Sequence, residues 1–163
     1  MSSHKPGWDD RWDEFAKWAE RGMEIQEELL HLVDEDTEAF NRIMAAFGMP
    51  KKTDEEKALR SEAIQQATLF ATEVPLETMK ASSRVFELCR QMVAEGNPNS
   101  VSDAGVGALA ARAAVLGAGM NVKINAASLK DRAKADALIA EADKLIEKAN
   151  AEEKEITAAV DKV

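Results

Sequence analysis

The sequence predicts an all-α protein, an up-and-down bundle of four to five long helices, and three observations support this. Ala, Glu, Lys and Leu are abundant and tyrosine is absent, a mixture that favours helix over strand. Apolar residues recur at helical spacing over long stretches. Clusters of Gly, Pro and Asn divide the chain into helix-length segments with short connections, and no segment alternates as a strand does.

The first long helix is expected over residues 8–47, after a polar, disordered lead-in over residues 1–7. Gly48 and Pro50 are typical of a helix end. Its apolar positions alternate spacings of four and three, so we expect them to form one packed seam. The seam consists of Phe15, Ala19, Gly22, Gln26, Leu29, Val33, Asp36, Phe40, Ile43 and Phe47.

The second helix is expected over residues 54–94. Thr53 and Glu56 form a capping box at its start. Pro75 lacks a backbone N–H, so it predicts a kink or a short break inside this helix. The polar run that follows, residues 96–100, is a dense turn signal.

A third helix, over about residues 102–127, is predicted to start at Ser102 as its N-cap. Its many Ala and Gly residues allow close approach of backbones, so it should pack centrally. The fourth helix, about 130–161, carries a stripe of Ala, Leu and Ile on an otherwise charged surface. All 163 residues are expected to form one domain.

The bulk numbers exclude several classes of function. The formal net charge is −9 and the basic residues are dispersed, which disfavours nucleic acid and anionic membranes as partners. We find no apolar run of membrane-spanning length and no secretory signal, and the single cysteine, Cys89, excludes an intrachain disulfide. A cytoplasmic location is therefore expected.

Asp36 is the first candidate for chemistry, because it lies on the predicted seam between Val33 and Phe40. A carboxylate on a packed face loses water, and this favours its protonated form and suits it to proton transfer. The alternative is an acid at the edge of the seam, or one half of a buried ion pair.

Two further groups of polar residues are candidates for ligand binding. In the run 96–103, Asn99, Ser102 and Asp103 stand beside a helix N-terminus, whose free N–H groups bind polar or anionic atoms; the alternative is a turn followed by a cap. Asn121 and Asn125 share one helix face, where paired amides can read a heterocycle edge or join two helices.

A metal site is not predicted. His4 and His31 stand alone, without a second ligand at helical spacing, and Cys89 has no histidine nearby in sequence. The tryptophans and methionines are interpreted as core or interface residues, and no phosphate-binding loop or dinucleotide fingerprint is present.

At several of these positions the sequence resembles the formimidoyltetrahydrofolate cyclodeaminase/methenyltetrahydrofolate cyclohydrolase family, which includes the C-terminal domain of formimidoyltransferase-cyclodeaminase. The resemblance covers nearly the whole chain. It is carried by five stretches in the family's order: 32–40 (LVDEDTEAF), 50–57 (PKKTDEEK), 73–76 (EVPL), 96–103 (GNPNSVSD) and 121–125 (NVKIN).

The resemblance implies a dimeric helical domain that binds tetrahydrofolate, with Asp36 as catalytic acid/base. It implies a substrate site formed by Asn99, Ser102, Asp103, Asn121 and Asn125, and Lys123 or Arg112 would offset the charge of the glutamate tail. The implied reaction converts 5-formimidoyltetrahydrofolate to the 5,10-methenyl form plus ammonia, in histidine degradation, or hydrolyses the methenyl form. The folate is the substrate, no cofactor is permanently bound, and a formimidoyltransferase domain is a possible partner.

The chain departs from the family at its start. Members usually begin with a Pro-Gly-Gly-Gly-Ser-type loop and a helix, and this sequence begins roughly where that helix would end. The third helix is then expected to expose apolar surface that drives oligomerisation. The alternative function is therefore a truncated, non-catalytic module that dimerises or binds folate.

Overall fold

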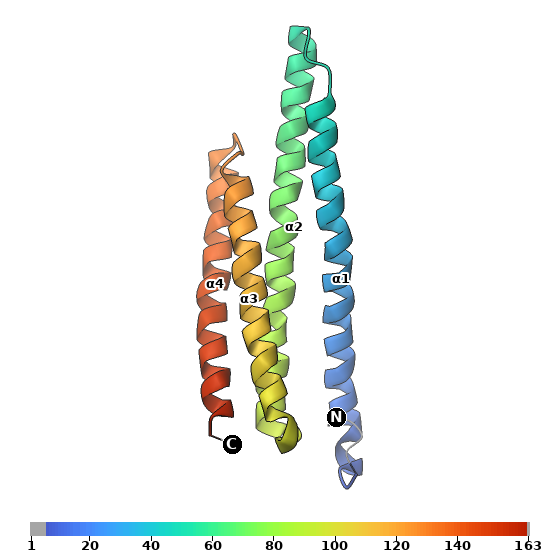
Figure 1. Cartoon of the computed structure of the whole chain (residues 1–163), viewed down its shortest axis with the longest axis vertical. Coiled ribbons are helices and arrows are strands. Elements are labelled where there is room, and N and C mark those ends of the chain that lie inside the picture. Colours follow the sequence, from blue (N-terminus) through green and yellow to red (C-terminus); the bar gives the residue numbers. More distant parts are fainter. Residues whose placement is uncertain (1–5, 163) are drawn as a thin grey trace.

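A computed structural model describes residues 6–162 and consists of four long helices within that range. They are α1 (Trp12–Gly48), α2 (Asp54–Glu95), α3 (Val101–Ala126) and α4 (Arg132–Val160). Short 3-10 turns, Asp9–Arg11 and Pro98–Ser100, precede α1 and α3. The helices alternate in direction, so the predicted all-α, up-and-down architecture is confirmed (Figure 1). Most of the expected disordered lead-in, residues 1–5, lies outside the described residues.

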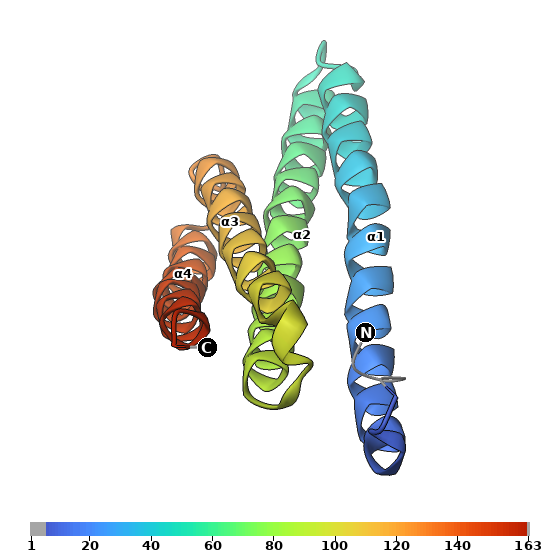
Figure 2. The same cartoon turned by 60° about the horizontal axis from the view of Figure 1, so that its bottom comes forward.

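α2 is the central helix of the bundle. α1 packs along one side of it, while α3 and α4 pack against the other and against each other (Figure 2). α1 lies nearest to α2 beside the turn that joins them and diverges from it toward its own N-terminus (Figure 1). The two sides of α2 are therefore covered to different extents.

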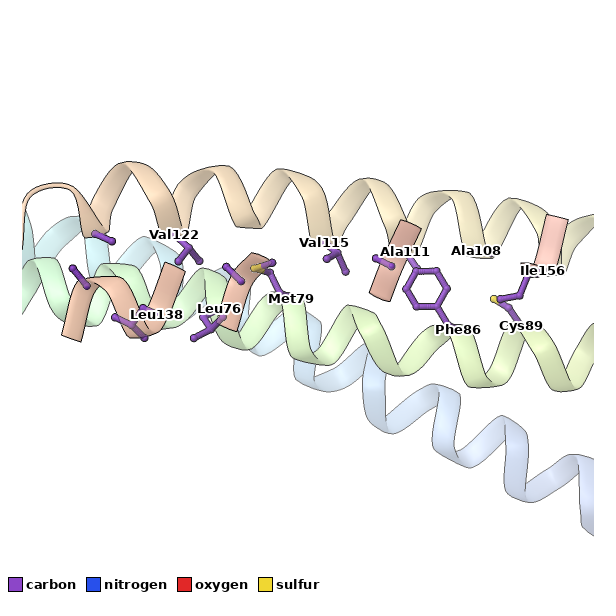
Figure 3. Packing of buried hydrophobic residues seen from close by; sticks show 14 of the residues in the cluster. Leu76, Met79, Phe86, Cys89, Ala108, Ala111, Val115, Val122, Leu138 and Ile156 are labelled. Atoms are coloured by element: carbon purple, nitrogen blue, oxygen red, sulfur yellow. The ribbon is translucent and has the colours of Figure 1, made fainter. Parts of the chain in front are cut away.

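The main core lies between α2, α3 and α4. Figure 3 shows Phe86 and Met79 of α2 directed toward α3, and these two residues and Leu76 are at most 2% exposed. The ends of two side chains pack directly against Gly119, because a Cβ there would lie 2.9 Å from Ile146 Cδ1 and 3.1 Å from Met79 Cε. The Ala- and Gly-rich helix packs against both α2 and α4, but Val106, Met120 and Ile124 are each at least 64% exposed, in line with the expectation that this helix exposes apolar surface.

Pro75 does not break α2, which runs unbroken from Asp54 to Glu95 with the proline buried inside it. A proline has no N–H to donate to the carbonyl four residues earlier, here that of Ala71. The side chain of Asn125 on α3 supplies the missing donor, with its Nδ2 atom 2.6 Å from the Ala71 oxygen. One interhelical bond thus satisfies the carbonyl that the proline leaves open.

The start of α3 differs from the prediction. α3 begins at Val101, Ser100 is its N-cap residue, and Ser102 lies in its first turn, exposed. The predicted N-cap, Ser102, therefore lies two residues after the observed N-cap, Ser100. The cap of α4 is Asp131, whose side chain accepts from Lys134 N at 3.0 Å.

The apolar character of the third helix was underestimated. Residues Pro98–Ala126 are long and apolar enough to span a membrane by length and composition. The expectation that no run reaches this length was wrong. The same residues pack between α2 and α4, and a central helix of a water-soluble bundle passes the same test.

The row of α1 residues that α2 buries lies one residue before the predicted seam along much of the helix. The buried row repeats every seven residues at Ile25, Leu32, Ala39 and Ala46. In the predicted seam, by contrast, Val33 and Phe40 are each 62% exposed and Phe47 is 52% exposed. The apolar stripe of α1 is wider than its contact with α2, so part of the stripe faces outward.

Candidate functional site

A pocket of about 410 Å³ opens where α1 diverges from α2, and we call it the end pocket. Apolar side chains of α1 and α2 form most of its walls, and polar residues around the N-terminus of α3 complete it. A largely apolar pocket with a few converging polar groups is the usual form of a small-molecule site. The lining residues are Phe15, Trp18, Ala19, Leu88, Cys89, Met92, Asn97, Ser100, Asp103 and Ala104.

The run 96–103 contributes to the end pocket, but not through all the residues that the sequence singled out. Asp103 lines the pocket, as predicted for a ligand-binding residue. Asn99 and Ser102 are exposed and do not line it. Asn97, whose side-chain oxygen accepts from the Asn99 N–H at 3.2 Å, and Ser100 line it instead. The spacing alone did not reveal which polar residues of this run line the pocket.

Two aromatic residues, Phe15 and Trp18, are the other part of the end pocket that the sequence did not assign to a site. The Arg11 guanidinium carbon lies 4.8 Å from the centre of the Phe15 ring, and that of Arg21 lies 5.9 Å from the Trp18 ring. Burial raises the pKa of the Cys89 thiol through desolvation, so the neutral thiol forms part of the apolar wall. The pocket therefore offers flat apolar faces beside one carboxylate, that of Asp103.

Asp36 lies elsewhere, on an exposed surface in the middle of α1. The expectation that helix packing removes Asp36 from water is wrong for the single chain. α2 buries Leu32 and Ala39 of α1, but it leaves Asp36 exposed. Asp36 continues a row in which Gly22 and Leu29 precede it at seven-residue intervals, and these two residues line a smaller apolar pocket between α1 and α2. Asp36 therefore stands at the border between the α2 contact and the exposed apolar stripe.

The two predicted halves of the site do not meet within one chain. Trp18, which shares the end pocket with Asp103, is 18 residues before Asp36 on the same helix. A rise of 1.5 Å per residue places the two positions about 27 Å apart. Asp36 and the 96–103 run therefore do not face a common point within the described chain.

Asn121 and Asn125 lie at the same level of the bundle as Asp36. Arg42 stacks over Phe70 of α2 at 4.1 Å and Glu28 pairs with Arg84 of α2, so Asp36 lies opposite the middle of the α2 segment between those partners. Asn125 contacts the same segment through its bond to the Ala71 carbonyl.

The side chains at this level differ in how free they are to meet a ligand. Asn121 is exposed, and Asn125 uses its N–H to join α3 to α2, the alternative that the sequence left open for the pair. Lys123 pairs with Asp143 of α4 at 2.6 Å, and Arg112 bonds Asn150 Oδ1 at 2.7 Å. The two cations expected to meet the glutamate tail are therefore already engaged with α4.

No group of three or more His, Cys, Asp or Glu side chains within residues 6–162 is arranged to hold a metal ion. His31 lies 3.5 Å from Glu35 on the exposed surface of α1, and His4 falls outside the described residues.

The sequence matches the family model described as formiminotransferase-cyclodeaminase over residues 1–161. A methenyltetrahydrofolate cyclohydrolase from Methylorubrum extorquens is 40% identical over 132 residues, which are 81% of this chain and 64% of that protein. A formimidoyltransferase-cyclodeaminase from Gallus gallus is 36% identical over 108 residues, which are 66% of this chain and 20% of that protein. The chain thus spans somewhat less than two thirds of the length of the first of these relatives and a fifth of the second.

A solved structure shares the fold. The crystal structure of formiminotetrahydrofolate cyclodeaminase from Thermotoga maritima matches with a TM-score of 0.81 and 22% sequence identity. The match covers 96% of this chain and 74% of that one. At this level of identity the likeness supports the helical architecture alone.

Proposed function

Because the chain belongs to the formiminotransferase-cyclodeaminase family, we propose that it catalyses chemistry at the one-carbon unit of a tetrahydrofolate, either releasing ammonia from the 5-formimidoyl form or hydrolysing the 5,10-methenyl form. The observation that carries this proposal is the family match over residues 1–161, a range that includes Asp36 and the 96–103 run. The 40% identity to a cyclohydrolase favours hydrolysis as the first reaction to test.

Asp36 is proposed to transfer the proton in either reaction. In hydrolysis its carboxylate accepts a proton from the water that attacks the methenyl carbon, and one carbon–nitrogen bond of the ring then breaks. In deamination its protonated form donates to the formimidoyl nitrogen as N10 attacks the carbon, the carboxylate then passes the N10 proton to the same nitrogen, and the bond to that nitrogen breaks as ammonia leaves. One carboxyl group at the reacting carbon is sufficient for both directions of proton transfer.

A second copy of the chain is proposed to complete the site. The surface around Asp36 carries Val33 and Phe40, each 62% exposed, and apolar rows of this kind are typical of interfaces. Covering them would remove water from Asp36 and could bring the end pocket of the partner toward it. Asn99, Ser102, Asp103, Asn121 and the oxygen of Asn125 are proposed to orient the substrate in that assembly.

The setting of the reaction is also part of the proposal. The enzyme would act in the cytoplasm and need no permanently bound cofactor, the tetrahydrofolate derivative being its substrate. Formimidoyl groups from histidine degradation would supply the deamination reaction. A formimidoyltransferase is the corresponding partner, since the Gallus gallus relative is named for both activities.

The test compares two acidic residues of α1. Asp36→Asn should lower turnover of methenyltetrahydrofolate by about 10²- to 10⁴-fold, the usual contribution of one general acid or base. The loss of near-ultraviolet absorbance of the substrate is followed against a buffer blank, and 5-formimidoyltetrahydrofolate is tested in parallel for ammonia release. Asp34→Asn is the matched control, because Asp34 is an exposed acid two residues away on the same helix. Equal rates in the two variants would remove Asp36 from the mechanism.

The exposure of Asp36 in the single chain favours one alternative, a folate-binding or dimerising module without catalysis. Such a module would raise its melting temperature when folate is added, yet leave the absorbance of methenyltetrahydrofolate at the blank rate. Turnover above the blank that depends on Asp36 excludes this alternative.

A further inference from the structure

A second pocket, of about 370 Å³, lies at the end of the bundle where α1 turns into α2 and α3 turns into α4. Four of its lining residues are cations and none is an acid, although the chain as a whole has a net charge of −9. We call it the basic pocket. Its lining residues are Lys51, Lys57, Arg60, Ser61, Ile64, Gln65 and Lys130.

Neutral hydrogen bonds hold one of these cations in place. Gln65 of α2 accepts from the Lys130 backbone N–H at 2.6 Å and donates to the Ser128 carbonyl at 3.2 Å, which fixes the α3–α4 turn against α2. The Lys130 ammonium then donates to Ser61 Oγ at 2.5 Å. The charge of Lys130 is thereby positioned without being neutralised.

Arg60 is held in the same way. Its Nε and Nη2 atoms donate to the Phe47 carbonyl at 3.3 and 3.1 Å, and its guanidinium lies 5.6 Å from the Phe47 ring centre. Every other arginine of the described chain pairs with a carboxylate. Arg60 therefore presents its charge to the pocket with no protein anion to balance it.

The other two cations differ in how far the protein balances their charge. Lys51 has no ion-pair partner within residues 6–162, and Lys57 pairs with Asp54 at 2.8 Å where both side chains are exposed. An ion pair between two exposed side chains has a small interaction energy, so Asp54 neutralises the charge of Lys57 only weakly. The first turn of α2, which includes Lys57, also carries Asp54, Glu55 and Glu56, but none of these three acids lines the pocket. These like charges repel one another, and one multivalent anion would stabilise all of them.

The basic pocket lies on the same face of α2 as Ala71. Lys57, Ile64 and Ala71 follow one another at seven-residue intervals, or two helical turns. Ile64 is then about 10 Å along α2 from the carbonyl that Asn125 bonds. On α1, Phe47 is 11 residues after Asp36, or about 16 Å along the helix. A ligand whose reacting end lies near Asp36 could therefore place an anionic tail in this pocket.

We propose that the basic pocket binds a small anion with two or more carboxylate groups. Two sources have this chemistry: the glutamyl tail of the folate, an assignment that rests on the proposed function, and a free di- or tricarboxylate. Arg60 supplies a fork that matches a carboxylate, while the three lysines supply point charges that suit further carboxylates.

Binding is tested by calorimetry on the full chain with free tri-γ-glutamate, citrate and inorganic phosphate as probes. The wild type should bind tri-γ-glutamate or citrate more tightly than phosphate, with an affinity that falls as salt is added. Arg60→Gln/Lys130→Gln should weaken this binding at least about tenfold through the loss of two charge-assisted contacts. The control Lys144→Gln/Lys148→Gln removes the same charge from the exposed surface of α4 and should leave the affinity unchanged.

Folding is checked separately, because Arg60 also bonds the end of α1. Lys130→Gln alone leaves that bond intact, and it should still weaken binding while the melting temperature stays at the wild-type value. Absence of binding to the wild type, equal binding by the pocket and control variants, or phosphate binding as tight as that of the carboxylates would each overturn the proposal.

Enzyme kinetics distinguish the two sources of the anion, the folate tail and a free carboxylate. If it is the folate tail, the KM of triglutamyl methenyltetrahydrofolate should rise about tenfold in the pocket variant, and the KM of the monoglutamate, which carries only two carboxylates, should rise less, with kcat unchanged. Citrate binding without this difference would assign the pocket to a free anion. If no folate is turned over but tri-γ-glutamate binding is still lost in the pocket variant, the proposed function fails and the pocket assignment stands.

Discussion

The two sides of α2 bury their apolar residues to different degrees. On the side of α3 and α4, Met79 and Val115 are fully buried and Phe86 is 1% exposed. On the side of α1, large residues such as Val33 and Phe40 are more than half exposed. The free energy of folding must therefore come mainly from the three-helix part, which leaves the surface of α1 available for a ligand or for another chain.

Small residues form the helix contacts on both sides of α2. α3 places small residues toward its neighbours, so backbones approach closely, as at Gly119 beside Met79 and Ile146. α1 uses alanines, Ala39 and Ala46, for its contact with α2 and turns its larger apolar residues outward, and α3 likewise leaves Val106, Met120 and Ile124 at least 64% exposed. A helix whose largest apolar residues face outward is suited to association rather than to sealing a core.

The largest effect that would test this comparison is expected at Met79. Met79→Ala should lower the free energy of unfolding by about 2–5 kcal/mol, because it leaves a cavity between α2, α3 and α4. Met44→Ala makes the same change on the exposed surface of α1, where Met44 is 54% exposed, and should cost less than about 0.5 kcal/mol. Urea unfolding at low protein concentration measures both. Similar losses would show that α1 contributes as much to the fold as the three-helix part.

A smaller effect is expected at the bond that compensates for Pro75. Asn125→Leu should cost about 1–3 kcal/mol, because it leaves the Ala71 carbonyl without a donor. Asn121→Leu is the control on the same helix, at an exposed position, and its effect should be within about 0.5 kcal/mol of zero.

A double-mutant cycle isolates the cause. Pro75→Ala restores a backbone N–H to α2, which can donate to Ala71 in place of Asn125. The cost of Asn125→Leu should then fall by at least about half in the Pro75→Ala background, whatever Pro75→Ala itself does to stability. An unchanged cost would mean that Asn125 stabilises the protein by some route other than this bond.

The helices could be predicted from the sequence because their signals are local. The capping box at Thr53 and Glu56 and the turn cluster after Glu95 each mark a boundary within a few residues. The local sequence does not determine which face of α1 is turned toward α2. Its apolar residues cover more than one face, and only the position of α2 decides that Leu32 is buried and Val33 is not.

The candidate site was less predictable for the same reason. Sequence patterns grouped Asn121 with Asn125, yet the partner of Asn125 is a carbonyl 54 residues away that a proline leaves open. The sequence around Lys123 gave no sign of its ion pair with Asp143, which comes from α4. The basic pocket joins two turns that are distant in sequence, and no spacing rule connects Arg60 with Lys130.

The smallest effect on stability is expected where α1 faces outward. Phe40→Ser should change the free energy of unfolding of the single chain by less than about 0.5 kcal/mol, because the side chain is 62% exposed. It should nevertheless weaken self-association, measured by light scattering across a dilution series, because the proposed interface loses an aromatic contact. Leu59→Ser, which removes a 61% exposed side chain from α2, is the control and should leave association unchanged. If both variants associate as the wild type does, the outward face of α1 is not the contact between copies, and the cover for Asp36 must come from another surface.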